Sequence, residues 1–359
     1  MDKLHGEQRI KNLLRIVAQQ GASDLHLVVG RYPTMRLDGK LYPITQETIL
    51  SAEDTKLLSD AMLTEENKTK LVEEGQVDFS YNFESKARFR TNVFFQKGNV
   101  SVTMRLISGK VRTLEELNVP TMLYDFMHYS QGLLLITGPV GHGKSTTLAA
   151  MIDFVNHNQD RHIITIEDPI EYIYEQDRCI INQREVGRDT KSFQDGLRAV
   201  FREDANIVLI GEMRDLDTIS TAMTAAETGH LILGTLHTND TTQTIDRIVD
   251  VFPAHQQNQM RSQLASVLVG VVSQRLVPKV GGGRVPAMEI MIKNHAVENL
   301  IRENKSYQID SVIETSLREG MISLDKALSD LVRRGVITAD DAFIYAKNPE
   351  YLQMLIGKG

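Results

Sequence analysis

One glycine-rich segment, residues 138–145, constrains what this chain can fold into more than any other feature. It reads GPVGHGKS and fits the phosphate-binding pattern G-x-x-x-x-G-K-[ST]. An apolar run over residues 133–137 precedes it and predicts a buried strand, and the helix formers from Thr147 onward predict a helix. In a strand, glycine loop and helix of this order, backbone N–H groups point at a phosphate. The sequence therefore predicts a nucleotide-binding site rather than a chance glycine-rich turn.

The expected roles within this loop follow from side-chain chemistry. We expect Lys144 to reach the β- and γ-phosphates of ATP and the Ser145 hydroxyl to bind Mg²⁺. At His142 the backbone is expected to matter more than the side chain. The residues predicted to bind the nucleotide are Gly138, Pro139, Val140, Gly141, His142, Gly143, Lys144, Ser145 and Thr146.

Length and composition limit the number of domains and the classes of protein to which this chain can belong. A chain of 359 residues predicts two domains. The net charge of −7 and the absence of Trp argue against a nucleic-acid groove as the main function. Cys179 is the single cysteine, which excludes a disulfide within the chain and a cysteine-type zinc site. The polar N-terminus and the lack of an 18-residue apolar stretch predict a cytoplasmic protein without direct membrane insertion, which reaches a membrane only through partners.

Residues 1–108 have the pattern of a small α/β domain. Helical spacing of apolar residues over 8–19 is followed by two short strand patterns, 25–29 and 34–37, and by a helical stretch over 52–72. From Val77 onward apolar and polar residues alternate with period two, which is typical of half-buried antiparallel strands. Residues 109–118 are the expected linker, beginning within Ser108-Gly109-Lys110.

Residues 119–359 have a different pattern. Four continuous apolar runs alternate with helical segments, at 133–136, 163–166, 207–210 and 231–236. Such runs predict a mostly parallel sheet covered on both faces, with its functional site at the carboxyl ends of the strands. After residue 283 the pattern is mostly helical. Leu324, Leu328 and Leu331 share one helix face, for which core packing is favoured over a partner surface.

Two acidic segments end strands of this sheet. Glu167 is the candidate for orienting the attacking water, and Asp168 for helping to hold the metal shell. The alternative is an acidic helix cap before Pro169. Residues 207–212 resemble a Walker B strand in which Gly211 replaces the usual Asp, so Glu212 is expected to act on the metal through a bound water. The alternative for Glu212 is a surface carboxylate.

Two histidines flank the strand pattern over 231–236. His237 follows it, at the edge predicted for the phosphate loop, and is interpreted as a sensor of the γ-phosphate. The alternative is a hydrogen-bonded core histidine. His230 precedes the strand and is therefore expected at the opposite end, in a structural or inter-domain role.

Phosphoryl transfer also uses arginines, because guanidinium groups stabilise the charge on the transferred phosphoryl group. Most arginines are solvated surface residues, and spacing alone does not select one. The candidates are Arg88, Arg90 and Arg105 in the first domain and Arg198, Arg202 and Arg214 in the second.

Four motifs in order resemble one known family. The phosphate loop is followed by TIEDPIEY over 165–172, LIGEMRD over 209–215 and GHLILGTLHTN over 229–239. Together they resemble the hexameric secretion-type ATPases of type II secretion and type IV pili. Within this family the chain is most similar to the retraction ATPases, whose N-terminal motif resembles ASDLHL over 22–27.

The resemblance implies a PAS-like fold for the first domain and a RecA-like P-loop domain for the second. It implies Glu167 as catalytic glutamate, Glu212 in an atypical Walker B, and His230 and His237 in a histidine box. Arg88 and Arg90 match first-domain arginines that reach the nucleotide. It also implies a homohexamer at the inner face of the cytoplasmic membrane, which turns over ATP with Mg²⁺ and acts on an inner-membrane pilus platform protein.

The chain also departs from the family pattern. Glu298 stands where the retraction ATPases have Arg in the segment 296–303, and His142 replaces a usual Ser. Assembly ATPases often carry four zinc-binding cysteines, which this chain lacks, and this favours retraction. The alternatives are an accessory retraction paralogue, an assembly or type II secretion ATPase, a RecA-like nucleic-acid translocase and a nucleotide-dependent scaffold without hydrolysis.

Overall fold

The computed structural model describes residues 3–37, 39–83, 87–107 and 111–357. The chain divides into two compact units, the first comprising residues 1–110 with 171–173 and the second residues 111–170 with 174–359. Residues 108–110, where the expected linker begins, lie outside the described residues. The domain boundaries therefore stay predictions. No helix among the described residues is long and apolar enough to cross a membrane.

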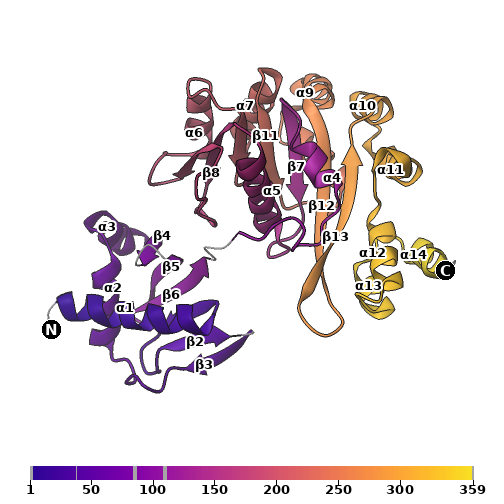
Figure 1. Cartoon of the computed structure of the whole chain (residues 1–359). Coiled ribbons are helices and arrows are strands. Elements are labelled where there is room, and N and C mark those ends of the chain that lie inside the picture. Colours follow the sequence, from indigo (N-terminus) through magenta and orange to yellow (C-terminus); the bar gives the residue numbers. More distant parts are fainter. Residues whose placement is uncertain (1–2, 38, 84–86, 108–110, 358–359) are drawn as a thin grey trace. The chain divides into compact units, whose positions relative to one another are not determined.

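Unit 1 is one antiparallel sheet with helices packed on one face (Figure 1). Its strand order is β3-β2-β1-β6-β5-β4. Its elements are α1 (Lys3–Gln20), β1 (Asp24–Leu27), β2 (Thr34–Leu37), β3 (Lys40–Pro43), α2 (Ala52–Met62), α3 (Glu65–Glu74), β4 (Gln76–Phe83), β5 (Ala87–Gln96) and β6 (Asn99–Ile107). The helical stretch expected over 52–72 is two helices, because Thr64 caps the N-terminus of α3 with its side chain.

The core of unit 1 follows directly from sequence periodicity. Helical spacing on α1 brings Ile10, Leu13 and Leu14 to the sheet, and period-two alternation on the strands brings residues such as Leu25 and Phe89 to meet them. All five side chains are fully buried. The alternate strand residues lie on the opposite face of this sheet.

Unit 2 is a seven-stranded sheet of order β13-β12-β7-β11-β10-β8-β9, in which only the β12–β13 pairing is antiparallel. Its strands are β7 (Gly132–Thr137), β8 (His162–Glu167), β9 (Ile180–Glu185), β10 (Ile207–Ile210), β11 (Leu231–Leu236), β12 (Leu268–Pro278) and β13 (Arg284–Ile292). The α/β fold class with a second, mostly parallel sheet is confirmed. The interpretation of the chain after residue 283 as mostly helical missed β13.

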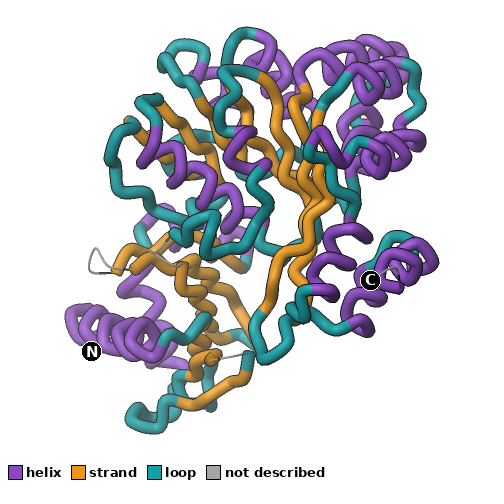
Figure 2. Tube along the Cα trace, turned by 45° about the vertical axis from the view of Figure 1, so that its right-hand side comes forward, coloured by secondary structure: helices purple, strands orange, loops and turns teal. Residues whose placement is uncertain are grey.

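Helices cover both faces of this sheet (Figure 2), which explains the continuous apolar runs of its strands. The helices are α4 (Met122–Phe126), α5 (Lys144–Asn158), α6 (Phe193–Val200), α7 (Leu216–Glu227), α8 (Thr241–Asp250), α9 (Ala254–Val267), α10 (His295–Arg302), α11 (Ile309–Thr315), α12 (Leu324–Arg333), α13 (Ala339–Tyr345) and α14 (Pro349–Gly357), with short 3₁₀ turns at Ser306–Gln308 and Leu317–Glu319. Leu324, Leu328 and Leu331 lie in a core cluster with Val277 and Val285, so their interpretation as core residues is confirmed.

Candidate functional site

The phosphate loop joins β7 to α5 and is held tightly against β12. Gly138 has φ 140° and Gly143 has φ 83°, values that favour glycine. A Cβ at Gly138 would lie 2.4 Å from the carbonyl oxygen of Gln274, and one at Gly143 would lie 2.9 Å from Gln274 Nε2. Gly138 is therefore required both by its backbone conformation and by the close approach of the β12 backbone, and Gly143 mainly by its backbone conformation.

Gln274 is a functional candidate that lies outside the sequence motifs. Its buried side chain donates from Nε2 to the carbonyl of His142 at 2.7 Å and accepts at Oε1 from the Thr147 hydroxyl at 2.7 Å. It thereby ties the loop and the first turn of α5 to β12. The sequence signal was three adjacent polar residues, Ser273, Gln274 and Arg275, within an otherwise apolar run, which indicates a polar contact inside the fold.

The side chain of His142 also holds the loop, in addition to its backbone, which was expected to matter more. Its Nδ1 accepts a hydrogen bond from the backbone N–H of Leu276 at 3.0 Å. Burial lowers the pKa of His142, and the nearby charges of Arg275, Arg284 and Lys144 lower it further. The ring is therefore neutral at pH 7 with its proton on Nε2, and it forms a second connection between the loop and β12.

Lys144 begins α5 and is almost fully buried, at 8% exposure. Its Nζ donates to the carbonyl oxygens of Gly138 at 2.7 Å and Pro139 at 3.1 Å, and it lies 3.1 Å from Nδ1 of His237. An ammonium group only donates hydrogen bonds, so Nδ1 of His237 accepts in this contact. The lysine is thus held at the loop by groups that phosphate oxygens can replace.

His237 connects the loop to the Walker B position. With Nδ1 accepting from Lys144, the neutral ring carries its proton on Nε2, which lies 3.0 Å from Oε1 of Glu212. Arg214 contacts the same carboxylate oxygen through its Nε. The structure therefore brings together Lys144, His237 and Glu212, three residues predicted from separate motifs, in one series of close polar contacts at the carboxyl ends of β7, β11 and β10.

Glu167 and Asp168 follow β8, which pairs with β10. Oε1 of Glu167 accepts from the Thr165 hydroxyl at 2.6 Å, whereas Asp168 is exposed. The glycine at position 211 has a steric reason, because a Cβ there would lie 3.3 Å from the Cα of Glu167. Glycine in place of the usual Walker B aspartate therefore allows the ends of β8 and β10, which carry Glu167 and Glu212, to lie close together.

The residues predicted to hold Mg²⁺ are oxygen donors of the type that this ion prefers: Ser145, Asp168 and Glu212. Within the described parts of the chain, no group of three His, Cys, Asp or Glu side chains is arranged to hold a metal ion. Mg²⁺ commonly keeps several waters and binds through one or two protein oxygens together with substrate phosphates, so this donor set fits the ion.

The predicted arginines and His230 differ in their surroundings. Arg88 and Arg90 belong to β5 of unit 1, where Arg90 is exposed. His230 contacts the Ala225 carbonyl at 3.0 Å and packs edge-on against Phe201, as expected for a structural residue at the opposite end of β11. Of the second-unit arginines, Arg198 and Arg202 are exposed, and Arg214 contacts Glu212.

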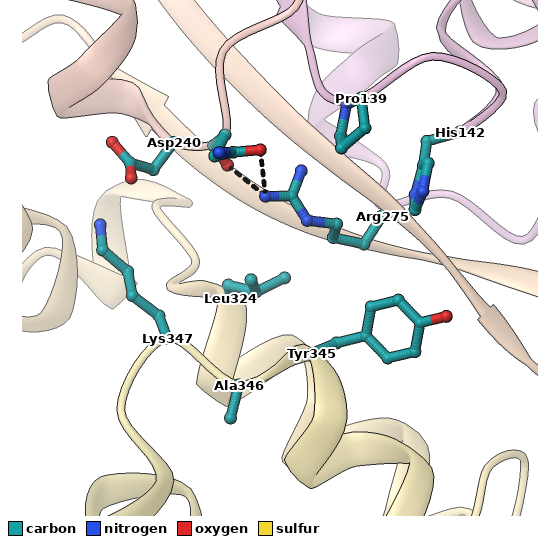
Figure 3. Close-up of a pocket in the computed structure, with 9 residues that line it drawn as sticks. Pro139, His142, Asp240, Arg275, Leu324, Tyr345, Ala346 and Lys347 are labelled. Atoms are coloured by element: carbon teal, nitrogen blue, oxygen red, sulfur yellow. Dashed lines mark hydrogen bonds between the residues drawn. The ribbon is translucent and has the colours of Figure 1, made fainter.

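A pocket of about 400 Å³ opens beside the phosphate loop (Figure 3). Pro139 and His142 line one side, and residues of the C-terminal helices, including Leu324 and Tyr345, line the other. Between them Arg275 donates to the backbone and side-chain oxygens of Asn239 at 3.1 and 3.0 Å. The segment that follows His237 is thus held against β12, next to the loop.

Several known proteins are similar to this chain in sequence and in fold. The family model described as type II/IV secretion system protein matches residues 2–299. The chain is 48% identical over 341 residues to the type IV pilus retraction ATPase PilT of Pseudomonas aeruginosa, covering 95% of this chain and 99% of that protein. It is 42% identical over 342 residues to a twitching motility protein of Neisseria gonorrhoeae, covering 95% and 91%.

A solved structure has the same fold along nearly the whole chain. The crystal structure of the pilus retraction motor PilT with bound ADP matches with a TM-score of 0.90 at 46% identity, covering 96% of this chain and 99% of that one. Since the family model spans most of the sequence and these relatives span almost all of it, this chain belongs to the type II/IV secretion system protein family.

Proposed function

We propose that this protein is an ATP-hydrolysing motor that powers retraction of type IV pili. The observation that carries the proposal is the series of close polar contacts from Lys144 through His237 to Glu212 at the phosphate loop. The similarity to a retraction ATPase over nearly the full length supports the same activity. In this proposal residues 1–108 form the N-terminal domain and residues 119–359 the motor domain.

Each polar group at the strand ends has a role in hydrolysis. The loop N–H groups and Lys144 bind the β- and γ-phosphates, and Ser145, Asp168 and Glu212 hold Mg²⁺ directly or through water. When bound, this ion neutralises charge on the phosphate oxygens. Glu167 orients a water and takes its proton as the water oxygen attacks the γ-phosphorus. The bond from that phosphorus to ADP breaks, so the products are ADP and phosphate.

His237 acts as the sensor through competition for Lys144. Phosphate oxygens bind the ammonium more strongly than a neutral imidazole does, because the hydrogen bond is then charge-assisted at both ends. When the γ-phosphate takes this bond, Nδ1 of His237 loses its donor. The loss of this hydrogen bond alters the contact of His237 with Glu212. It also affects the segment after His237, where Asn239 is bound by Arg275 of β12. In this way the nucleotide state is coupled to the position of these two segments.

The wider assembly follows from the family resemblance. We propose a homohexamer on the cytoplasmic side of the inner membrane, with Arg88 and Arg90 of the first domain reaching the nucleotide phosphates. Its partner is the inner-membrane pilus platform protein, from which ATP turnover draws pilin subunits out of the pilus. The alternative is an accessory retraction paralogue, which has the same site but does not suffice for retraction alone.

The proposal is tested by ATP hydrolysis and by pilus retraction together. Wild type is expected to release phosphate from ATP, and Lys144→Ala is expected to release almost none. A strain deleted for the gene should carry excess pili and lose surface motility, and only wild type should restore both. Equal phosphate release by wild type and Lys144→Ala would overturn the ATPase assignment. Cells without pili would mean that the protein powers assembly, and an unchanged phenotype would indicate an accessory paralogue or an unrelated motor.

A further inference from the structure

The motif ASDLHL of unit 1 places two polar side chains on the sheet face opposite the helices. Leu25 and Leu27 are fully buried in the core of the unit. Because strand side chains alternate between faces, Asp24 and His26 belong to the other face. The proposed mechanism so far gives this segment no role.

Strand register places Asp24 in a row of arginines on this face. Asp24 pairs with Arg36 on β2 and with Arg105 on β6, and Arg105 pairs in turn with Arg90 on β5. Directly opposed side chains are about 5 Å apart at Cβ, and like charges in such pairs destabilise a sheet. A row of three arginines and one aspartate therefore has a structural cost, which an anionic ligand would offset.

Asp24 is the buried member of this row. Its side chain is 5% exposed, its Oδ1 accepts from Arg105 Nε at 2.9 Å, and its Oδ2 accepts from the Ser23 hydroxyl at 2.7 Å. Arg36 Nε lies 3.6 Å from Oδ2. Burial raises the pKa of Asp24, but the hydrogen bonds from Ser23 and Arg105 and the neighbouring positive charge outweigh it, so the net pKa is lowered and the carboxylate is ionised at pH 7.

The pairing holds Arg105 without covering it. Only Nε of the guanidinium meets the carboxylate, while the Arg105 side chain remains 70% exposed. The terminal amino groups make no other hydrogen bond or ion pair recorded among the described residues. A guanidinium anchored at Nε presents these two donors in a fixed orientation, which suits an oxyanion.

We propose that Asp24 is a positioning residue, whose buried carboxylate orients Arg105 beside Arg90 so that the two guanidinium groups bind phosphate oxygens together. This inference rests on the proposed function, in which first-domain arginines bind the phosphates of ATP. It gives the ASDLHL segment a role in catalysis that passes through Arg105 rather than through contact with the nucleotide.

The test is a double-mutant cycle on the full chain, measuring kcat and KM for ATP. Asp24→Asn keeps the shape of the side chain and removes its charge, and Asp24→Glu keeps the charge but shifts the carboxylate by one methylene. Both are expected to lower kcat, by roughly 10- to 100-fold, because a displacement of about 1 Å in a positioned group has effects of that size. Since both act through Arg105, Asp24→Asn combined with Arg105→Ala should be no slower than Arg105→Ala alone.

Asp54→Asn is the matched control for loss of a paired carboxylate in the same unit. Asp54 caps α2 and pairs with Arg9, so its removal should lower Tm and leave kcat unchanged. Wild-type kcat in both Asp24 variants, or multiplying effects in the double variant, would overturn the inference. If Asp24→Asn does not fold, Asp24→Glu alone decides it. A failure of the ATPase assignment can be told apart from a failure of this inference. In that case Lys144→Ala would release phosphate from ATP as fast as wild type.

Discussion

The two units place polar groups on their sheets in opposite ways. In unit 2 both faces of the sheet are covered by helices, and the candidate catalytic groups lie at the ends of its parallel strands. In unit 1 helices pack on one face, and the arginines lie across the other face of antiparallel strands. In a parallel sheet that is buried on both faces, only the ends of the strands are accessible to a substrate. An antiparallel sheet covered on one face also exposes regularly spaced side chains on its other face.

The largest effect is expected from the face of unit 1. Arg90→Ala should lower kcat for ATP by roughly 10³-fold, as loss of an arginine that stabilises transferred phosphoryl charge does. Binding of ADP should change far less, because the loop of unit 2 is intact. Steady-state phosphate release and a fluorescent-ADP titration measure the two quantities. A normal kcat would mean that the unit 1 face takes no part in the chemistry.

At the strand ends of unit 2, Glu167→Gln should lower kcat by roughly 10²- to 10³-fold, because it removes the group that takes the proton of water. ATP should still bind, in contrast to Lys144→Ala. Single-turnover hydrolysis together with a binding titration separates these variants. Glu171→Gln, four residues on, is the control and should retain wild-type turnover. Rapid hydrolysis by Glu167→Gln would instead identify Glu167 as an acidic cap.

The close contact of the loop with β12 predicts a change in stability. Gly138→Ala should lower the free energy of unfolding by about 3 kcal/mol, because its Cβ would meet a backbone oxygen that cannot move away easily. Gly229→Ala is the matched control: φ there is 111° with no atom within 4 Å of a Cβ, so only backbone strain of roughly 1–2 kcal/mol is expected. Denaturant unfolding measures both, and equal losses would contradict the steric argument.

The smallest effect is a pH dependence from His142. Its pKa is lowered in the folded state, so the unfolded chain takes up the proton first as the pH falls below about 6.5. The stabilising contribution is therefore present above that pH and is lost as the pH falls toward the folded pKa. His142→Ser should flatten this part of the Tm profile between pH 7 and pH 5. The pKa of His26 in unit 1 is also lowered, and that histidine remains in both proteins, so the difference between their profiles isolates His142.

Local sequence patterns were sufficient for much of the fold. The alternation in unit 1, the apolar runs of β7, β8, β10 and β11, and the loop before α5 were all predicted, because each depends on residues close together in the chain. The boundary between α2 and α3 was missed because the cap at Thr64 interrupts an apolar pattern that otherwise continues. β13 was missed because an apolar run of that length reads equally as helix or strand until it pairs with β12.

The sequence by itself determined that a phosphate loop, two acidic strand ends and a histidine would lie along one edge of a parallel sheet. Only the tertiary structure decided which of them touch. Lys144 meets His237 across 93 residues, Gln274 meets Thr147 across 127, and Arg105 meets Asp24 across 81. These contacts depend on the order and register of strands far apart in sequence, and register is set by the packing of the whole sheet rather than by any local pattern.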